Sequence, residues 1–414
     1  MRIDKFTLAL LNQKLVMRTI WENDSINKSE IARLTGLSLP TVAKITERLL
    51  SSRVIRTSQR DQQTTGRRID MYEFAGDGFF SLGLELSPSA VKVVLIDLTG
   101  KTVRSGKQMV RDFRNPDAVL CLAVKLLKEV LTASAVSENK ILGIGVGMPG
   151  ILDSTQTKVL FSPNFHWENV ELKDILERQL TEHNILIPVY LENANRALAI
   201  GEQYFGAGAG YDYFVCINLG HGIGAASVEG GRLCSGASGT SGELGHIIVE
   251  KDGPLCSCGN HGCLEALASG RALAQQARNM ISSGVASIIP ELAQGISENI
   301  EARTVFQAAR DQDPAALELV RQAGEYIGIG ISNYISLLDP EAIILAGGMS
   351  NEDILIQQIQ KSVKFRRMRF AGRRVKIMIS QLGEYGTAIG AAAIQLKYLI
   401  EQGGLPLTKG QEAI

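Results

Sequence analysis

The chain has 414 residues, of which 45% are hydrophobic and 21% are charged, and its formal net charge at pH 7 is zero. This composition is ordinary for a soluble globular protein, and the length allows two or three domains. The apolar stretches are far shorter than the roughly 20 residues that a membrane-spanning helix needs. The N-terminus lacks the small-residue cleavage site of a signal peptide, so we expect a cytoplasmic protein.

The charge is distributed unevenly along the chain. Residues 1–72 contain 13 Lys and Arg but only 7 Asp and Glu, a net charge of +6, and the remaining residues carry −6. A basic first segment on an acidic remainder indicates that the first segment meets a polyanion. A solvated basic surface without a partner is the alternative.

The first 51 residues predict three helices. Asn27 and Glu30 resemble a capping box at the start of a short second helix, and Gly36 suits the left-handed turn that ends it. Ser38 can cap a third helix that has Pro40 in its first turn. Apolar residues at helical spacing predict a first helix before these, on Leu8, Leu11, Leu15, Val16, Ile20 and Trp21. This is the layout of a helix-turn-helix, whose second helix enters the major groove of DNA.

The third helix is expected to bury Val42, Ile45 and Leu49 and to turn Thr46 and other polar side chains outward. Residues 53–56 and 69–72 then predict two strands of a hairpin wing with a basic tip. Lys and Arg bind phosphates without reading sequence, whereas polar side chains of the recognition helix reach base edges. The DNA-binding candidates are Ser38, Thr41, Lys44, Arg48, Arg67 and Arg68. A three-helix packing module that binds no DNA is the alternative.

From residue 76 onward the pattern changes to mixed strands and helices. Strands are predicted at 79–86, 90–98, 141–148, 189–191, 213–219, 223–228 and 342–345, and helices at 116–134, 194–204, 315–337 and 385–400. Such a mixture, with glycine-rich turns at the strand ends, is typical of an α/β architecture, here of two lobes. Glycine turns at strand ends let a ligand approach the backbone closely.

A metal site is predicted from three of the six cysteines, Cys256, Cys258 and Cys263. Six cysteines in a chain of this length are too few for a disulfide framework. The spacing Cys-x-Cys-x4-Cys with a nearby histidine supplies three thiolates and one imidazole, the closed four-ligand set of a structural zinc site. Nearby candidates for the imidazole are His221, His246 and His261.

Two segments together resemble a known family. Residues 241–246 (Ser-Gly-Glu-Leu-Gly-His) and 256–265 (Cys-Ser-Cys-Gly-Asn-His-Gly-Cys-Leu-Glu) are similar to the signature of the ROK family of repressors, open reading frames and sugar kinases. The helix-turn-helix ending in Thr-Gly-Arg-Arg at 65–68 is similar to the repressor branch, which includes xylose and N-acetylglucosamine repressors. The resemblance covers essentially the whole chain. It implies an actin-like, two-lobed fold of the ribonuclease H-like type behind a winged helix-turn-helix.

The resemblance also implies domain bounds and ligand-binding residues. The DNA-binding domain would span 1–75, the first lobe 76–195 with helix 385–402 packing back onto it, and the second lobe 196–384. The ligands of one structural zinc would be His246, Cys256, Cys258 and Cys263. The sugar-binding residues would be Gly150, Asn164, Asn193, Glu243, His246 and Glu265. His246 would bind zinc through one ring nitrogen and face the sugar with the other.

Two departures separate the chain from the sugar kinases that it resembles. The kinases have a phosphate loop Asp-x-Gly-Gly-Thr where residues 85–89 are Glu-Leu-Ser-Pro-Ser, and Pro88 removes an amide donor. The kinases have a catalytic Asp where this chain has Ala194, whose methyl group cannot accept a proton. A one-residue slip that brings Glu192 to that place is the exception that the sequence leaves open.

The sequence therefore predicts a non-enzymatic transcriptional regulator, a homodimer on a pseudo-palindromic operator. A sugar would close the cleft between the lobes and release the DNA. A kinase with a regulatory DNA-binding domain is one alternative, and a repressor controlled by a protein partner from sugar transport is another. The sequence does not identify the sugar, nor does it separate a repressor from an activator.

Overall fold

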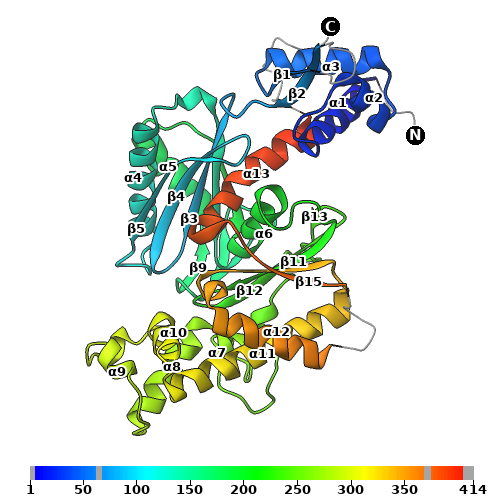
Figure 1. Cartoon of the computed structure of the whole chain (residues 1–414). Coiled ribbons are helices and arrows are strands. Elements are labelled where there is room, and N and C mark those ends of the chain that lie inside the picture. The colour runs from blue at the N-terminus through cyan, green and yellow to red at the C-terminus, as the bar shows by residue number, and fades with distance from the viewer. Residues whose placement is uncertain (1–4, 62–67, 368–373, 404–414) are drawn as a thin grey trace.

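The computed structural model describes residues 5–61, 68–367 and 374–403. A small domain lies at one end of a larger body that has two lobes (Figure 1). The small domain, which we call the head, consists of α1 Lys5–Trp21, α2 Lys28–Thr35, α3 Leu39–Ser51, β1 Ile55–Asp61 and β2 Arg68–Phe74. β1 and β2 pair as an antiparallel hairpin. The three predicted helices and the two wing strands are thus confirmed.

Short-range hydrogen bonds define the turn between α2 and α3. The Asn27 side-chain oxygen accepts a hydrogen bond from the Glu30 amide at 3.0 Å, and Ser38 Oγ accepts one from the Thr41 amide at 3.4 Å. Gly36 has a φ of 70°, a left-handed conformation that glycine adopts without strain. These bonds satisfy amides of the first helical turns that have no partner within the helix.

The expectation that Thr46 points outward was wrong. Its side chain is fully buried, together with those of Val42, Ile45 and Leu49. The Thr46 hydroxyl donates to the carbonyl oxygens of Val42 and Ala43, at 3.0 Å in each case. Because the preceding helical turn satisfies the hydroxyl, the side chain can enter the core without losing a hydrogen bond.

The first lobe is built on a five-stranded sheet with the strand order β10-β6-β3-β4-β5. Its strands are β3 Phe80–Leu86, β4 Ala90–Asp97, β5 Thr102–Met109, β6 Ile141–Met148 and β10 Val189–Asn193. Helices α4 Pro116–Ser134 and α5 Leu172–Glu182 cover one face, and α13 Gly386–Gln402 covers the other (Figure 1). A small sheet joins this lobe, with strands β7 Ile151–Leu152, β8 Val159–Ser162 and β9 Trp167–Val170.

The second lobe has its own five-stranded sheet, with the order β13-β12-β11-β14-β15. Its strands are β11 Tyr213–Leu219, β12 Ile223–Glu229, β13 Arg232–Leu233, β14 Ala342–Ala346 and β15 Lys376–Ile379. Helix α6 Ala194–Phe205 covers one face. The other face carries α7 Leu264–Ala268, α8 Gly270–Ser282, α9 Ile289–Leu292, α10 Ala302–Arg310, α11 Pro314–Leu338 and α12 Asp353–Arg366.

The lobes meet where α6 and α13 cross, with their backbones in direct contact at two glycines. A β-carbon on Gly201 would lie 2.9 Å from the Gly390 Cα, and one on Gly390 would lie 1.8 Å from the Ala197 carbonyl oxygen. On its other side α13 touches the first sheet just as closely, since a β-carbon on Gly83 would lie 1.8 Å from the Ala388 carbonyl oxygen. Only glycine permits such approaches, so the backbone of α13 contacts both α6 and β3 directly.

The strands and helices predicted for the body are confirmed, with bounds that shift by a few residues. Sequence reasoning missed β5, whose side chains are mostly exposed and which therefore lacks an apolar pattern. It also missed the small sheet and the helices between residues 264 and 310. In the part of the chain that the structure describes, every helix is too short or too polar to cross a membrane.

Candidate metal centre, effector cleft and DNA interface

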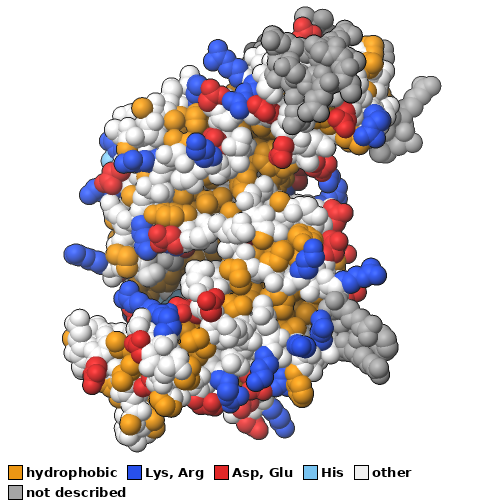
Figure 2. All heavy atoms as spheres, in the orientation of Figure 1, with side chains coloured by type: hydrophobic (Ala, Val, Ile, Leu, Met, Phe, Trp, Pro, Cys, Tyr) orange, Lys and Arg blue, Asp and Glu red, His pale blue; other side chains and the backbone are white. Residues whose placement is uncertain are grey.

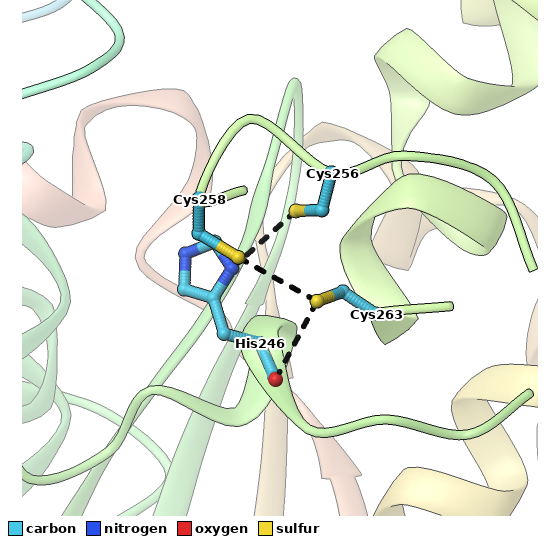
Figure 3. A group of neighbouring side chains, drawn as sticks. All are labelled: His246, Cys256, Cys258 and Cys263. Atoms are coloured by element: carbon cyan, nitrogen blue, oxygen red, sulfur yellow. Dashed lines mark hydrogen bonds between the residues drawn. The ribbon is translucent and has the colours of Figure 1, made fainter. Parts of the chain in front are cut away.

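Four side chains converge beside the second sheet in the arrangement of a metal site (Figure 3). His246 ends the short 3-10 helix η2 Leu244–His246, Cys256 and Cys258 lie in the following loop, and Cys263 caps α7. Their ligand atoms all lie within 4.8 Å of one another. The structure thus brings together the histidine and three cysteines that the family resemblance implies.

The orientation of the histidines separates the three candidates for the imidazole ligand. His246 Nδ1 lies 3.6 Å from Cys256 Sγ, inside the cluster. His261 is exposed, and its Nδ1 lies 3.2 Å from the Gly253 carbonyl oxygen. The third candidate is His221. Burial lowers its pKa, and the nearby positive charge of Arg271 lowers the pKa further. Of these rings, His246 is the one that belongs to the four-residue cluster.

The donor set fits a structural metal rather than a catalytic one. Three thiolates and one imidazole fill the four positions of a tetrahedral zinc and leave none for an activated water. Desolvation and hydrogen bonding among the three thiols raise the pKa of Cys263 to about 12. A cation bound by the cluster would favour the ionised form of this thiol, and its binding would release protons.

Two glutamates, Glu243 and Glu265, lie next to the cluster. Glu243 Oε2 lies 3.8 Å from His246 Nε2, the ring nitrogen that faces away from the thiols. Burial raises the pKa of Glu243, with His246 opposing and Glu265 reinforcing the change. Glu265 is held on the β11–β12 turn, because its Oε2 accepts a hydrogen bond from the Ile223 amide at 3.0 Å. Its other oxygen accepts one from Arg271 Nη2 at 3.3 Å.

The first lobe contributes a second group of predicted effector residues. Asn193 Nδ2 donates to the Gly150 carbonyl oxygen at 3.0 Å, and Gly150 has a φ of 131° that favours glycine. Asn193 Oδ1 also accepts from the amides of Asn195 and Arg196, so the same side chain caps α6. Asn164 is exposed in the turn after β8. Gly150 and Asn193 are therefore directly connected, whereas Asn164 stands apart from them in the hydrogen-bond network.

The two groups of effector residues adjoin one another through α6. Asn195 lies against β12, where a β-carbon on Gly224 would be 1.9 Å from Asn195 Nδ2. Asn218 of β11 donates to Asn195 Oδ1 at 3.2 Å. The surface is hollowed between the two lobes, and charged side chains of both signs line the rim of the hollow (Figure 2). A small polar ligand bound in this hollow would contact both lobes.

Glu192, the carboxylate that could have replaced the missing kinase base, is engaged by other groups. It is buried, and its Oε1 lies 3.1 Å from Arg196 Nε and accepts a hydrogen bond from the Asn193 amide at 2.9 Å. Its Oε2 accepts one from Gln156 Nε2 at 3.2 Å. Ala194 is the first residue of α6. Both oxygens of the Glu192 carboxylate are thus engaged by neighbouring groups of the same chain.

Sequence reasoning missed Arg196, which connects α6 with a loop of the second lobe. Its Nη2 donates to Ser235 Oγ at 2.9 Å and its Nη1 donates to the Gly239 carbonyl oxygen at 3.3 Å. Both partners lie in the loop that leads to Glu243, so Arg196 ties α6 to the effector loop of the second lobe. The sequence did contain one signal, an arginine beside two asparagines in the first turn of a helix. It could not reveal the partners of this arginine, because they are distant in sequence.

The turn that corresponds to the kinase phosphate loop is closed by side chains. Ser87 Oγ accepts a hydrogen bond from the Ala90 amide at 3.1 Å, which occupies a donor that a phosphate would need. Burial raises the pKa of Glu85, whereas the ammonium of Lys92, 3.2 Å away, opposes this. Lys92 also donates to the Glu384 carbonyl oxygen at 2.6 Å, just before α13. Lys92 was another residue that sequence reasoning missed.

The predicted DNA-contacting residues lie on the α3 side of the head, as far as the structure describes them. Ser38 and Lys44 are exposed, Thr41 is half-buried, and Ser38 Oγ lies 2.8 Å from Thr41 Oγ1. Arg48 is exposed near the other end of α3, where its Nη1 donates to Gln13 Oε1 at 3.1 Å. Arg67 lies outside the described residues, and only the backbone of Arg68, paired with Asp61, is described.

Comparisons with known proteins agree with this architecture. The sequence profile of the ROK family matches residues 81–397, and that of a winged helix-turn-helix DNA-binding domain matches residues 11–56. The chain is 34% identical to a glucokinase of Thermotoga maritima over 76% of the chain and 96% of the relative. It is 26% identical to the xylose repressor of Bacillus subtilis over 96% of the chain and 98% of the relative.

A solved structure extends the similarity to the whole fold. It is a ROK family transcriptional regulator, a homologue of the MLC protein of E. coli, with a TM-score of 0.79 and 27% identity. The match covers 96% of this chain and 97% of that one. Head and body thus have the same arrangement as in a known regulator of this type. The chain belongs to the ROK family, and it carries an N-terminal winged helix-turn-helix domain in front of the family's sugar-kinase-like body.

Proposed function

We propose that the protein is a DNA-binding transcriptional regulator, a repressor that a carbohydrate effector releases from its operator. The observation that carries this proposal is the combination of a DNA-binding head with a kinase-like cleft that lacks a free base. By its resemblance to the kinases, the chain would have Ala194 at the base position, and Glu192 is paired with Arg196. A ligand can still meet polar groups of both lobes, but neither Ala194 nor the ion-paired Glu192 would offer it a free carboxylate at the position of the kinase base.

The relatives also differ in how much of this chain they cover. The glucokinase aligns with the body alone, over 76% of this chain, whereas the xylose repressor aligns with head and body, over 96%. This supports a regulatory function for the full chain and a carbohydrate as its effector. Loss of a positioned base typically lowers a reaction rate by about 10²–10⁴-fold, and the closed turn at Ser87 removes phosphate-binding amides as well. We therefore propose that the chain is not a kinase.

The effector would bind between Gly150 and Asn193 of one lobe and Glu243, His246 and Glu265 of the other. These residues combine one backbone segment, one amide, one imidazole and two carboxylates, a set of fixed donors and acceptors that suits sugar hydroxyls. We include Asn164 as a side chain that could reach the effector from the exposed turn after β8. The cleft would close on the ligand by a hinge motion of the lobes.

The effector can be tested by release from DNA. A duplex selected by the full chain from a random-sequence pool should be released by one of D-xylose, D-glucose, N-acetylglucosamine or their phosphates. Coupling of this kind is typically about 5–150-fold in affinity. Glu243→Ala should bind the duplex normally but lose release, because a carboxylate of the effector site is gone. Asp252→Ala, an exposed acidic residue of the same loop region, should respond like the unmodified chain. Normal release from Glu243→Ala would contradict the assignment of this site.

For DNA recognition, we propose a homodimer that presents two α3 helices to a two-fold operator. Ser38, Thr41 and Lys44 would meet base edges, and Arg67 and Arg68 of the wing would meet phosphates or the minor groove. Arg48 would bind a phosphate through N–H groups other than the one that donates to Gln13, since a guanidinium has five donors. This places base reading in the N-terminal half of α3.

Lys44→Ala should weaken binding to the selected duplex by about 1–3 kcal/mol, because a base contact is lost. Binding to a mixed-sequence duplex should change far less, which separates base reading from phosphate contact. Lys125→Ala, an exposed lysine of α4 in the body, is the matched control and should bind both duplexes normally. Titrations that show an equal loss on both duplexes would contradict the placement of Lys44 at a base edge.

We propose that the cluster of His246, Cys256, Cys258 and Cys263 holds one structural zinc ion per chain. Zinc would fix the loop between Glu243 and Glu265, which carries the second-lobe half of the effector site. His246 would bind the metal through Nδ1 and leave Nε2 free for the effector, as its contacts with Cys256 and Glu243 suggest.

Metal analysis of the purified chain should give one zinc per chain. Cys258→Ser should lose the metal and unfold at a lower temperature, because zinc at a hundredfold excess over its Kd stabilises a native protein by about 2.7 kcal/mol. Cys234→Ser, a partly exposed cysteine outside the cluster, should keep its zinc. A zinc content far below one per chain in the unmodified protein would rule out the assignment.

A further inference from the structure

Helix α6 connects the effector site with the DNA-binding head. Its N-cap is Asn193, which we assign to the effector site, and its last residue is Phe205. Twelve residues of α-helix rise about 18 Å, and an α-helix of this length moves as a rigid rod. The inference below rests on the proposed function, because it explains how an effector bound at one end of α6 acts at the other.

The far end of α6 contacts the head through an aromatic junction, which we define as Trp21, Phe74, Tyr204 and Phe205. Trp21 is the last residue of α1, and its ring centroid lies 5.7 Å from that of Tyr204 and 5.9 Å from that of Phe205. Within the head, Trp21 packs edge-on against Phe74 of the wing strand β2, at 5.1 Å. One side chain thus joins α6, α1 and the wing.

Helix α13 holds the same head at a second point. Leu396, Leu399 and Ile400 share a buried cluster with Val16, Met17 and Ile20 of α1. At the end of α13, the Gly403 carbonyl oxygen accepts a hydrogen bond from Gln13 Nε2. The other end of the Gln13 amide accepts from Arg48 of the recognition helix α3. The head is therefore attached to the body at two places on α1. The end of α1 at Trp21 contacts α6, and the preceding turns of α1 contact α13.

The glycine crossing of α6 and α13 lies between the effector site and the head. At Gly201 and Gly390 the two backbones touch, and beside this contact the side chain of Ile200 packs with those of Ala393 and Ile394. A contact between two glycines leaves room for one helix to shift on the other, and the side chains packed beside it limit the shift. Because α6 packs on the second sheet and α13 on the first, a change in the angle between the lobes rotates one helix on the other.

We propose that α6 is a lever that pivots on α13 at Gly201 and Gly390 and carries the state of the effector cleft to the head through Trp21. When the lobes close on the effector, the Asn193 end of α6 moves with the cleft, and the Phe205 end displaces Trp21. The α13 contact through Gln13 holds the other part of α1 in place, so the displacement turns α3 relative to the body. In the proposed dimer, two heads turned in this way no longer fit the two half-sites of one operator.

The chain contains two tryptophans, Trp21 and Trp167, which allows a direct test. In Trp167→Phe the sole indole is at the junction, and its emission reports on the contacts with Tyr204 and Phe205. D-xylose, D-glucose and N-acetylglucosamine are titrated onto the zinc-loaded full chain, and binding is followed independently by the thermal unfolding temperature. The sugar that stabilises the protein should shift Trp21 emission with the same half-saturation. Trp167→Phe combined with Glu243→Ala should show neither effect.

The outcomes separate the lever from the function on which it rests. A sugar that raises the unfolding temperature but leaves Trp21 emission unchanged overturns the lever and leaves the effector site intact. If none of the sugars stabilises the protein or shifts the emission, the proposed effector fails, and the lever fails with it.

Trp21→Ala gives a second, independent readout. This variant should bind the selected duplex to within about threefold of the unmodified chain, while sugar-induced release, expected at about 5–150-fold, falls below about twofold. Leu11→Ala on the exposed face of α1 is the matched control and should keep full release. Full release from a folded Trp21→Ala chain overturns the role of Trp21. If this variant does not fold, the emission of Trp21 in Trp167→Phe still tests the lever.

Discussion

The close contact between the backbones of α6 and α13 is the constraint on which the arrangement of the molecule depends. Gly201, Gly390 and Gly83 let α13 lie directly between the first sheet and α6, so each lobe contributes one of the two crossing helices. The far ends of the same helices carry the head, and the near end of α6 is capped by Asn193, which we propose as an effector residue. The connection between cleft and head thus follows from how two helices pack.

Two carboxylates in and near the cleft are paired with basic side chains. A kinase needs a free carboxylate near the sugar hydroxyl, and here the carboxylate of Glu192 is neutralised by Arg196, while Lys92 accompanies Glu85 beneath the former phosphate turn. Buried ion pairs add little net stability, but they hold defined geometry. Arg196 also binds Ser235 and Gly239, so its charge positions the loop that leads to Glu243. These ion pairs and hydrogen bonds connect α6 with the loop of the second lobe.

Much of the fold could be predicted because its signals are short-range. The cap at Asn27, the left-handed Gly36 and the apolar strands are local patterns, and the cysteine spacing predicted that Cys256, Cys258 and Cys263 lie together. Arg196 could not be found in this way, since its loop partners lie about 40 residues farther along the chain. Thr46 was misplaced because helical periodicity does not reveal that its hydroxyl bonds to Val42. The hydrogen bonds that engage Glu192 likewise depend on Gln156, which only the folded chain brings near.

The central claim is that the cleft binds a carbohydrate without deprotonating it. Phosphorus NMR of the zinc-loaded chain with magnesium, ATP and a saturating concentration of the sugar that stabilises it would test this most directly. The account predicts that the ATP resonances persist and that no sugar phosphate forms, while the same sugar still weakens binding to DNA. Sugar phosphate produced at the 1–10³ turnovers per second typical of enzymes would contradict it.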